Sequence, residues 1–336
     1  MKIVLDAMGS DTHPVPDVEG AVWAARELSV SVILVGDENR IKPELAKHNT
    51  GGLDVSIVHA PSAIGMTEHV EAVKEKKDAS MNIGMKLVKE KQADAFVTAG
   101  NTGAAMAAAI VGPHALGRIK GIKRPALTTT LPTATGRTLL LDIGANADVK
   151  PEYLYQFALM GSIYAERALG IANPRVGLLS NGEEEGKGPM IVREAYAMCK
   201  SAKINFCGNA EGRDIPAGTF DVIACDGYVG NVAIKLSEAL AITLVGFIRA
   251  EIKKRPMAIA GAALAKPAFD ALKTRLDPSE FGGGVLLGVD GVVIIGHGRS
   301  DAKAIKNAIR VAKETVAGNV VDMIRAGVQS ESTTTA

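Results

Sequence analysis

The sequence predicts an α/β fold, a three-layer α/β/α sandwich in which helices cover both faces of one mixed, mostly parallel sheet. Two observations lead to this fold class. Short runs rich in Val, Ile and Leu alternate with Ala-rich helical stretches along almost the whole chain, as in parallel strands joined by crossover helices. The composition, with 36 glycines and only 4% aromatic residues, fits a protein with many tight turns and an aliphatic core.

The expected elements follow from this alternation. The expected strands are residues 3–5, 31–35, 55–58, 95–98, 126–131, 138–142, 176–180, 204–207 and 221–224. The expected helices include residues 17–27, 103–115, 151–169, 188–202 and 232–253. One pair of strands, 285–289 and 292–295, flanks Asp290-Gly291, which favours a type I′ hairpin turn. The sheet is therefore expected to be mixed.

Length and charge limit the domain organisation and the partners. A chain of 336 residues forms either one large domain or two lobes. We expect a single domain over residues 1–328, possessing a protruding apolar helical segment at 254–275, and a disordered Ser/Thr-rich tail at 329–336. A net charge of +1 provides no overall basic field, so nucleic acid is not an expected partner.

Cysteine usage and hydropathy point to the cytoplasm. The three cysteines, Cys199, Cys207 and Cys225, form no CxxC motif and have no histidine at ligand spacing. We expect them to be buried, reduced thiols. The segment after Met1 lacks the features of a signal peptide, and no apolar run approaches the roughly 20 residues that span a bilayer.

Four turns share one design, in which a strand ends, Gly and Asn or His follow, and a helix begins. These turns are residues 99–103, 142–146, 226–231 and 296–300. Glycine lets the backbone approach a ligand, and free N–H groups at helix N-termini favour phosphate. The carboxyl edge of a parallel sheet is where such turns gather. Any one of them alone is more often a loop with its helix cap, but four together predict a phosphate site.

The turns provide most of the candidate residues. The candidates for binding phosphate or thioester are Asn101, Gly103, Asn146, Asp226, Gly227, Gly230, Asn231 and Ser300. Lys235 lies four residues after Asn231, so both face one side of a helix. His297 is the one histidine of six inside a glycine-rich turn, which favours an acid–base or hydrogen-bonding role. None of the turns matches the dinucleotide fingerprint or the P-loop, so neither NAD nor ATP is indicated.

A fifth segment, residues 180–188, also follows a strand. It combines Asn181, three glutamates at 183–185 and Lys187. The carboxylates are open to three interpretations: a metal site, a group that orients a base, or a cap for the next helix. A bare charge run is usually a solvated loop.

In sequence order, seven stretches closely resemble the bacterial phosphate acyltransferases of phospholipid synthesis. They are residues 6–11, 99–103, 141–146, 178–188, 208–212, 226–235 and 286–298. The resemblance implies transfer of a fatty acyl group from acyl carrier protein to inorganic phosphate, giving acyl phosphate, with no metal or other cofactor. It also implies an isocitrate/isopropylmalate dehydrogenase-like fold and a homodimer. Tyr228, Arg299 and Ser10 depart from the family pattern and put details of the pocket in doubt, not the reaction.

Within that reaction we expect Asn101, Asn146, Asn181 and Asn231 to line the site. Lys187 and Lys235 would neutralise phosphate, and His297 would orient it or protonate the departing sulfur. The resemblance further implies a downstream glycerol-3-phosphate acyltransferase as pathway partner.

Two surfaces are candidates for contacts outside the site. The cluster Lys253-Lys254-Arg255 is a candidate for docking the acidic carrier, or a solvated helix end. The apolar segment 256–269, flanked by cations, is either a peripheral membrane contact at the inner face of the cell membrane or a dimer interface.

Three other functions compete with this interpretation. A phosphate acetyltransferase would use acetyl-CoA instead of a long acyl chain on a carrier. A dehydrogenase of the isocitrate type lacks support, because no Asp-rich metal motif or nucleotide segment is found. A membrane-bound scaffold would form no acyl phosphate.

Overall fold

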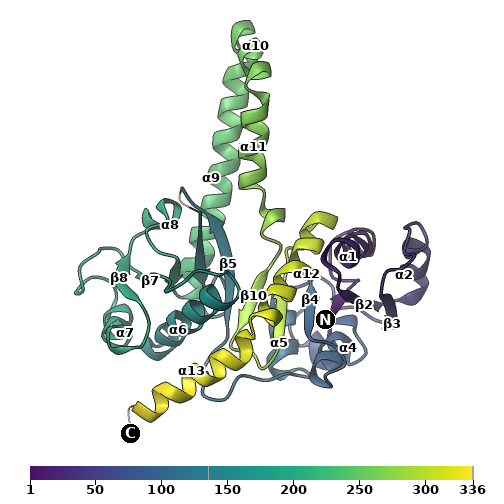
Figure 1. The fold of residues 1–336 in the computed structure, drawn as a ribbon, viewed down its shortest axis with the longest axis horizontal. Helices are drawn as coiled ribbons and strands as arrows, with labels where there is room; N and C mark the ends of the chain where they lie inside the picture. The colour runs from purple at the N-terminus through teal and green to yellow at the C-terminus, as the bar shows by residue number, and fades with distance from the viewer. Residues whose placement is uncertain (135, 335–336) are drawn as a thin grey trace.

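Eleven strands form one sheet in the part of the chain that the structure, a computed structural model, describes: residues 1–134 and 136–334 (Figure 1). The spatial order is β3-β2-β1-β4-β11-β10-β5-β6-β9-β7-β8. In chain order the strands are β1 (Lys2–Asp6), β2 (Ser31–Gly36), β3 (Val55–His59), β4 (Ala95–Thr98), β5 (Ala126–Pro132), β6 (Arg137–Leu141), β7 (Val176–Leu179), β8 (Phe206–Ala210), β9 (Val222–Ala224), β10 (Gly284–Leu287) and β11 (Val292–Ile295).

The sheet is mixed, as predicted. Neighbouring strands are parallel except at three pairings near its middle, where β10 is antiparallel to β11 and to β5, and β5 is antiparallel to β6. The expected Asp290-Gly291 hairpin is the β10–β11 pair. Two successive reversals around β10 leave β5 parallel to β11, and the third makes β6 run opposite to β4 and β11. This reversal decides where the functional turns lie.

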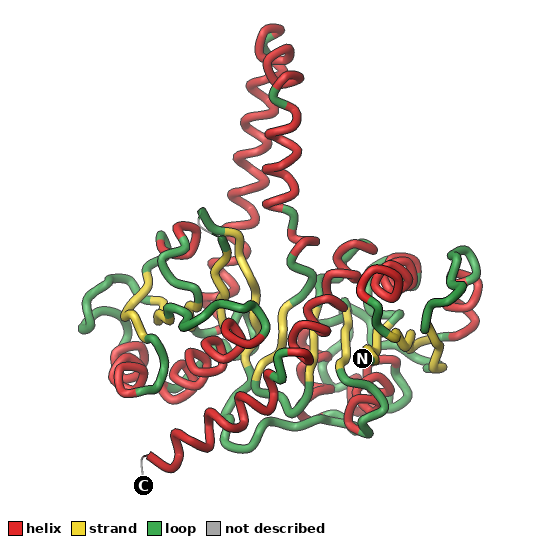
Figure 2. Tube along the Cα trace, viewed as in Figure 1, coloured by secondary structure: helices red, strands yellow, loops and turns green. Residues whose placement is uncertain are grey.

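Helices cover both faces of the sheet (Figure 2). They are α1 (Val15–Leu28), α2 (Glu38–Leu45), α3 (Ala72–Glu75), α4 (Ser80–Lys89), α5 (Thr102–Val111), α6 (Pro151–Arg167), α7 (Met190–Ser201), α8 (Asp214–Ala217), α9 (Gly227–Lys253), α10 (Pro256–Leu264), α11 (Lys266–Leu276), the 3-10 helix η1 (Pro278–Glu280), α12 (Ala302–Ala317) and α13 (Val320–Thr334).

The core divides into two main layers because strand side chains alternate between the faces. In β1, Ile3 and Leu5 pack into the cluster formed with α1, α6, α7 and α12, whereas Val4 packs into the cluster formed with α4 and α5. Phe157 of α6 and Phe96 of β4 are fully buried, one in each cluster. This arrangement is the predicted three-layer sandwich.

Some elements differ from the sequence expectations. Helices α2, α4, α12 and α13 were not among the expected helices, and β8 begins later than residue 204. The expected disordered tail is helical up to Thr334, because α13 buries Val320, Ile324 and Val328 and continues from that anchor. Residues 335–336 lie outside the described residues.

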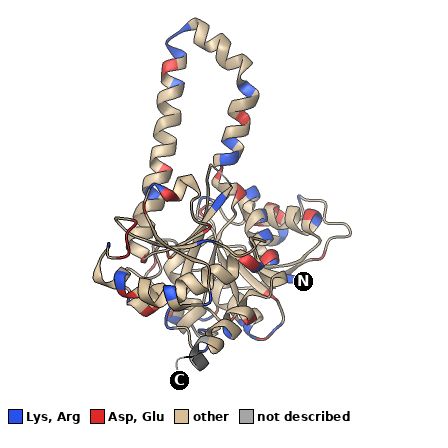
Figure 3. Ribbon diagram, turned by 60° about the vertical axis from the view of Figure 1, so that its left-hand side comes forward, with Lys and Arg blue, Asp and Glu red and all other residues tan. Residues whose placement is uncertain are grey.

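A helical arch made of α9, α10 and α11 projects from the sandwich (Figure 1). Figure 3 shows its ascending arm, α9, and its descending arm, α11, standing apart, joined across the tip by α10. Neither α10 nor α11 buries any residue. Pro256 and Pro267 sit in the first turns of α10 and α11, which is where proline ends one helix and begins another.

The projection is longer than the segment expected at 254–275, because most of α9 belongs to it. By length and composition alone, α9 is the one helix in the described chain that could cross a membrane, and none of its most apolar window is buried. The expectation that no run approaches that length was therefore wrong. Lys235 and Glu238 interrupt the apolar residues near its start and hid the signal.

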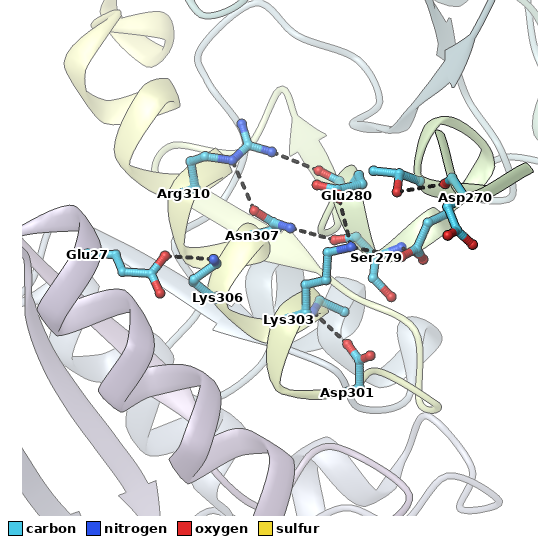
Figure 4. Close-up of polar contacts among 12 residues, drawn as sticks. Glu27, Asp270, Ser279, Glu280, Asp301, Lys303, Lys306, Asn307 and Arg310 are labelled. Carbon is cyan, nitrogen blue, oxygen red and sulfur yellow. Dashed lines mark hydrogen bonds and ion pairs between the residues drawn. The ribbon is translucent and has the colours of Figure 1, made fainter. Parts of the chain in front are cut away.

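The descending arm is anchored to α12 (Figure 4). Lys303 forms ion pairs with Asp277 at 2.9 Å and Glu280 at 2.7 Å, and Asn307 Nδ2 donates to the Ser279 carbonyl at 2.7 Å. These partners raise the pKa of Lys303, and Lys303 lowers the pKa of Asp277. The lower end of the descending arm is therefore held against α12.

Candidate active site

The expected site turns fall into two groups at opposite edges of the sheet. Because β6, β7 and β9 run opposite to β4 and β11, their carboxyl ends lie at the other edge. The turns at 142–146, 180–188 and 226–231 follow the first three strands, and the turns at 99–103 and 296–300 follow the other two. The expectation of one shared carboxyl edge was therefore wrong, since it required a sheet without the reversal around β10.

Asp142 organises the turn after β6. Its buried carboxylate accepts hydrogen bonds from the backbone N–H groups of Ala145 at 2.7 Å and Asn146 at 3.0 Å, and from Asn146 Nδ2 at 2.8 Å. Burial raises the pKa of Asp142, and these N–H donors oppose the rise. Gly144 has φ 144°, a backbone conformation that favours glycine. The turn is thus folded around one carboxylate.

The N-terminus of α9 packs directly on this turn. The Gly227 N–H donates to the Asn146 carbonyl at 2.7 Å, and Asn231 Nδ2 donates to the Ile143 carbonyl at 3.0 Å. A Cβ at Gly230 would lie 2.0 Å from the Asp142 carbonyl oxygen, so only glycine fits there. The structure therefore brings Asn146, Gly227, Gly230 and Asn231 together.

The same helix end combines a positive helix dipole with a carboxylate cap and a nearby lysine. Asp226 caps it, since its side chain accepts from the Val229 N–H at 2.8 Å. A helix of 27 residues presents a partial positive charge at this end, where anions are stabilised. Lys235 is exposed about one turn further along. Tyr228 and Val229, 67% and 41% exposed, place apolar surface beside the same turn.

Cys225 lies under this turn as a neutral thiol. Its Sγ donates to the carbonyls of Leu141 at 3.2 Å and Asp142 at 3.4 Å, and burial raises its pKa well above the ordinary value. Cys199 is also buried, and burial raises its pKa to about 12. Cys207 is exposed, contrary to expectation, because it lies on the edge strand β8.

The turn after β4 is held by its own asparagine. Asn101 Oδ1 caps α5 by accepting from the Ala104 N–H at 3.0 Å, and its Nδ2 donates to the carbonyls of Met66 at 3.0 Å and Glu68 at 3.1 Å. Gly103 lies beside that side chain and Val70. Every polar atom of the Asn101 side chain is thus engaged in holding the turn.

The turn after β11 meets the first loop of the chain. Ser300 Oγ donates to the His297 carbonyl at 2.6 Å, and the Asp11 N–H donates to the Gly298 carbonyl at 2.8 Å. His297 itself is exposed.

Sequence reasoning missed a buried carboxylate pair at this edge. Asp6 accepts from Thr98 Oγ1 at 2.9 Å, and Asp17 accepts from Ser10 Oγ at 2.5 Å. Burial raises the pKa of Asp17 to about 7. The stretch 6–11 was seen only as a family resemblance. The signal was Asp6 at the end of a strand of otherwise buried apolar residues.

The glutamate segment is held by separate ion pairs. Glu183 pairs with Arg213 at 2.6 Å and Glu185 with Lys200 at 2.9 Å. Within the described residues, no three metal-ligating side chains gather in one place. Asn181 and Lys187 are both exposed, and the Lys187 N–H donates to the Glu184 carbonyl at 3.0 Å. Because this segment follows β7, it lies at the same edge of the sheet as the N-terminus of α9.

Comparison with known proteins adds a family to this geometry. The family model described as "Fatty acid synthesis protein" matches residues 1–323. A phosphate acyltransferase from Pelotomaculum thermopropionicum is 51% identical over 331 residues, covering 98% of this chain and 96% of that protein. A phosphate acyltransferase from Dictyoglomus turgidum is 52% identical over 319 residues, covering 94% of each.

Solved structures support the fold. A phosphotransacetylase from Streptococcus pyogenes matches with a TM-score of 0.60 at 17% identity, covering 96% of this chain and 94% of that one. A structure described as a 4-hydroxythreonine-4-phosphate dehydrogenase from Salmonella typhimurium matches with a TM-score of 0.54 at 11% identity, covering 94% of this chain and 99% of that one. These two likenesses place the sandwich among folds of the expected dehydrogenase-like type. With the sequence matches, they lead to one conclusion: the chain belongs to the phosphate acyltransferase family, whose members act in fatty acid and phospholipid synthesis.

Proposed function

We propose that this protein transfers a fatty acyl group from acyl carrier protein to inorganic phosphate, giving acyl phosphate and the free carrier thiol. The observation that carries the proposal is the N-terminus of α9 seated on the Asp142 turn. There Gly227, Asn146 and Asn231 form one hydrogen-bonded unit at the positive end of a long helix. Such a helix end holds a phosphate dianion without any metal or nucleotide motif.

The reaction needs no nucleophile from the protein. An oxygen of hydrogen phosphate attacks the thioester carbonyl carbon, the carbon–sulfur bond breaks, and the phosphate proton ends on the departing thiol. Holding the two reactants in contact can contribute on the order of 7–11 kcal/mol to lowering the barrier. N–H donors aimed at the developing oxyanion contribute further. The neutral, buried thiol of Cys225 is unsuited to attack in their place.

We assign phosphate binding to the α9 edge. Asn146, Asp226, Gly227, Gly230 and Asn231 shape the turn, and Lys235 supplies the charge that neutralises phosphate. Lys187 and Asn181 act from the neighbouring segment at that edge. The group at the other edge shapes its own turns through Asn101, Gly103 and Ser300. His297 lies at that edge too, so we do not assign to it the proton that the departing sulfur receives.

The decisive assay uses the purified chain with a long-chain acyl carrier thioester and phosphate, and traps acyl phosphate as its hydroxamate. We expect phosphate-dependent product and little turnover of acetyl-CoA. Efficient turnover of acetyl-CoA alone would establish a phosphate acetyltransferase, and no product from any thioester would establish a scaffold. Lys187→Ala and Asn231→Ala variants, if both were near wild type, would overturn the residue assignment.

The product defines the protein's place in the cell. Acyl phosphate is a reactive mixed anhydride, so a glycerol-3-phosphate acyltransferase consuming it completes the route to phosphatidic acid.

The protein is cytoplasmic, and its arch reaches the inner face of the cell membrane through residues 256–269. The apolar arms pair with those of a second copy in a homodimer. Support for these contacts comes from the exposure of Met257 and Leu264, 85% and 86%, and of Phe247 in α9, 64%.

A further inference from the structure

One loop carries a local excess of positive charge, although the charges of the whole chain nearly balance. The whole protein has 38 Lys and Arg against 37 Asp and Glu. Between Asp94 and Asp142, however, the sequence has no acidic residue. Four cations fall within seven positions of this stretch, in the loop between α5 and β5, at Arg118, Lys120, Lys123 and Arg124. We call residues 118–124 the basic loop.

The basic loop is built to present these cations. Ile119 and Ile122, which alternate with them, are 1% and 4% exposed, whereas all four cations are exposed. The backbone is fixed by hydrogen bonds from the Ile119 N–H to the Gly288 carbonyl at 3.0 Å and from the Lys123 N–H to Gln156 Oε1 at 2.8 Å. Gln156 Nε2 returns a bond to the Gly121 carbonyl at 2.9 Å. The charge is therefore held at a defined place.

No acidic side chain within the described residues neutralises this charge. None of the four cations forms an ion pair there, although Arg118 donates to the Lys123 carbonyl. The neighbouring carboxylate Asp290 is already paired with Arg325. Four exposed, unpaired cations on a rigid loop create a local positive field that attracts an acidic surface.

The basic loop lies beside the α9 edge of the site. The next residue after it, Pro125, accepts a 2.8 Å hydrogen bond from Asn146 Nδ2 through its carbonyl. The arch lies at the other end of the molecule: β10 descends from the arch base at Gly284 and ends at Leu287, which pairs with Ala126 (Figure 1). A membrane bound at the arch tip would leave the basic loop facing the solvent.

We infer that the basic loop is the docking surface for the acidic carrier protein that delivers the acyl thioester, an inference that rests on the proposed function. A carrier is far larger than the thioester it delivers, so its docking surface has to lie beside the reacting site. Complementary charge speeds encounter and fixes orientation. The cluster Lys253-Lys254-Arg255 fits this role poorly, because Lys254 and Arg255 already pair with Glu251, at 2.6 and 3.4 Å, near the tip of the arch.

The test compares two triple charge reversals. The first is K120E/K123E/R124E in the basic loop, and the matched control is K253E/K254E/R255E at the arch tip. Each is assayed with an acyl carrier thioester and with a neutral N-acetylcysteamine thioester. We expect the loop variant to raise the KM for the carrier substrate by about tenfold or more, and added salt to raise the wild-type KM in the same direction. In the loop variant, the KM for the small thioester should stay within about twofold of the wild-type value. In the control variant, the KM for the carrier substrate and the KM for the small thioester should both stay within that range.

Three outcomes would overturn the inference: an unchanged carrier KM in the loop variant, an equal loss with both thioesters, or a loss confined to the control. Loss of binding to anionic phosphatidylglycerol vesicles with an unchanged carrier KM would identify a membrane surface instead. A K120Q/K123Q/R124Q variant, which removes charge without reversing it, should give an intermediate KM if the reversal variant folds poorly.

If the wild type turns over the small thioester but not the carrier thioester, the proposed function fails. Calorimetric titration of the carrier protein into wild type and the loop variant then decides the docking inference separately. Weaker binding to the loop variant supports it, and equal binding or none contradicts it.

Discussion

Asn231 Nδ2 donates a 3.0 Å hydrogen bond to the backbone carbonyl of Ile143, joining two turns that lie 88 residues apart in the sequence. The bond fixes the first turns of α9 against the loop that Asp142 folds around itself. A helix end can hold an anion only when its surroundings are equally fixed. This contact and the hydrogen bond from the Gly227 N–H to the Asn146 carbonyl together join two separate Gly/Asn turns into one candidate phosphate site.

Removing that contact should impair turnover more than folding. We predict that Asn231→Ala lowers kcat/KM by about 100-fold, since a displacement of about 1 Å at a reacting group has effects of that size. Steady-state assays with carrier thioester and phosphate measure it. The matched control is Ser237→Ala, which removes a hydroxyl bonded only within α9, to the Ala233 carbonyl. Equal activity in both variants would contradict the assignment.

Two glycines in α9 should respond oppositely to the same substitution. Gly230→Ala places a methyl group against the Asp142 carbonyl and Cys225 Sγ, and we expect a loss of about 1–3 kcal/mol in the free energy of unfolding. Gly246→Ala meets open space and should gain up to about 1 kcal/mol in helix propensity. Chemical denaturation compares them. A Gly230→Ala protein as stable as wild type would show that α9 is not seated as described.

The buried carboxylate Asp17 predicts a pH dependence of stability. Burial raises its pKa from 3.8 to about 7, so the folded state holds a proton that the unfolded chain has already released. The stabilisation that this proton contributes is complete below the pKa of Asp17 in the unfolded chain. It is lost as the pH rises through the pKa of Asp17 in the folded state. The slope is at most about 1.4 kcal/mol per pH unit.

Substitution by a neutral side chain of similar shape isolates this effect. Wild type should lose stability relative to Asp17→Asn between pH 5 and pH 8. Urea unfolding at both pH values measures the difference. If the difference in stability between wild type and Asp17→Asn is the same at pH 5 and at pH 8, Asp17 does not titrate in this range.

The arch tip should determine binding to lipid. Ile259→Glu with Leu264→Glu places two carboxylates on an exposed apolar helix and should abolish flotation with anionic liposomes. Met190→Glu, at a residue 65% exposed on α7, is the matched control and should float like wild type. Flotation of both variants, or of neither, would contradict membrane contact through this helix.

Much of the fold follows from short-range patterns. Strand β2 contains a continuous run of buried aliphatic residues from Val32 to Val35, and all four residues of β4 are buried. The Asp290-Gly291 turn identifies the β10–β11 hairpin. Helix α4 was missed because Ser80, Asn82 and Gly84 dilute its apolar periodicity, although all three are buried in the structure. The length of the arch was missed because Lys235 and Glu238 interrupt the apolar residues near the start of α9, so the protrusion was expected to begin only at residue 254.

The site was harder to predict than the fold. The residues at the α9 edge were identified individually, since glycines and asparagines at strand ends are visible in the sequence. Their separation from Asn101 and His297 depends on β5 and β10 lying side by side, a pairing of segments more than 150 residues apart. The basic loop was overlooked because the net charge of +1 conceals a stretch with no acidic residue.

The role of phosphate as the attacking group is tested most directly by following the carrier thiol in a single turnover. Enzyme is mixed in excess with an acyl carrier thioester, with and without phosphate, and quenched on the millisecond scale. We predict no burst of free thiol without phosphate, and thiol release equal to acyl phosphate formed when phosphate is present. A stoichiometric burst without phosphate, with the acyl group covalently bound to the protein, would contradict direct attack.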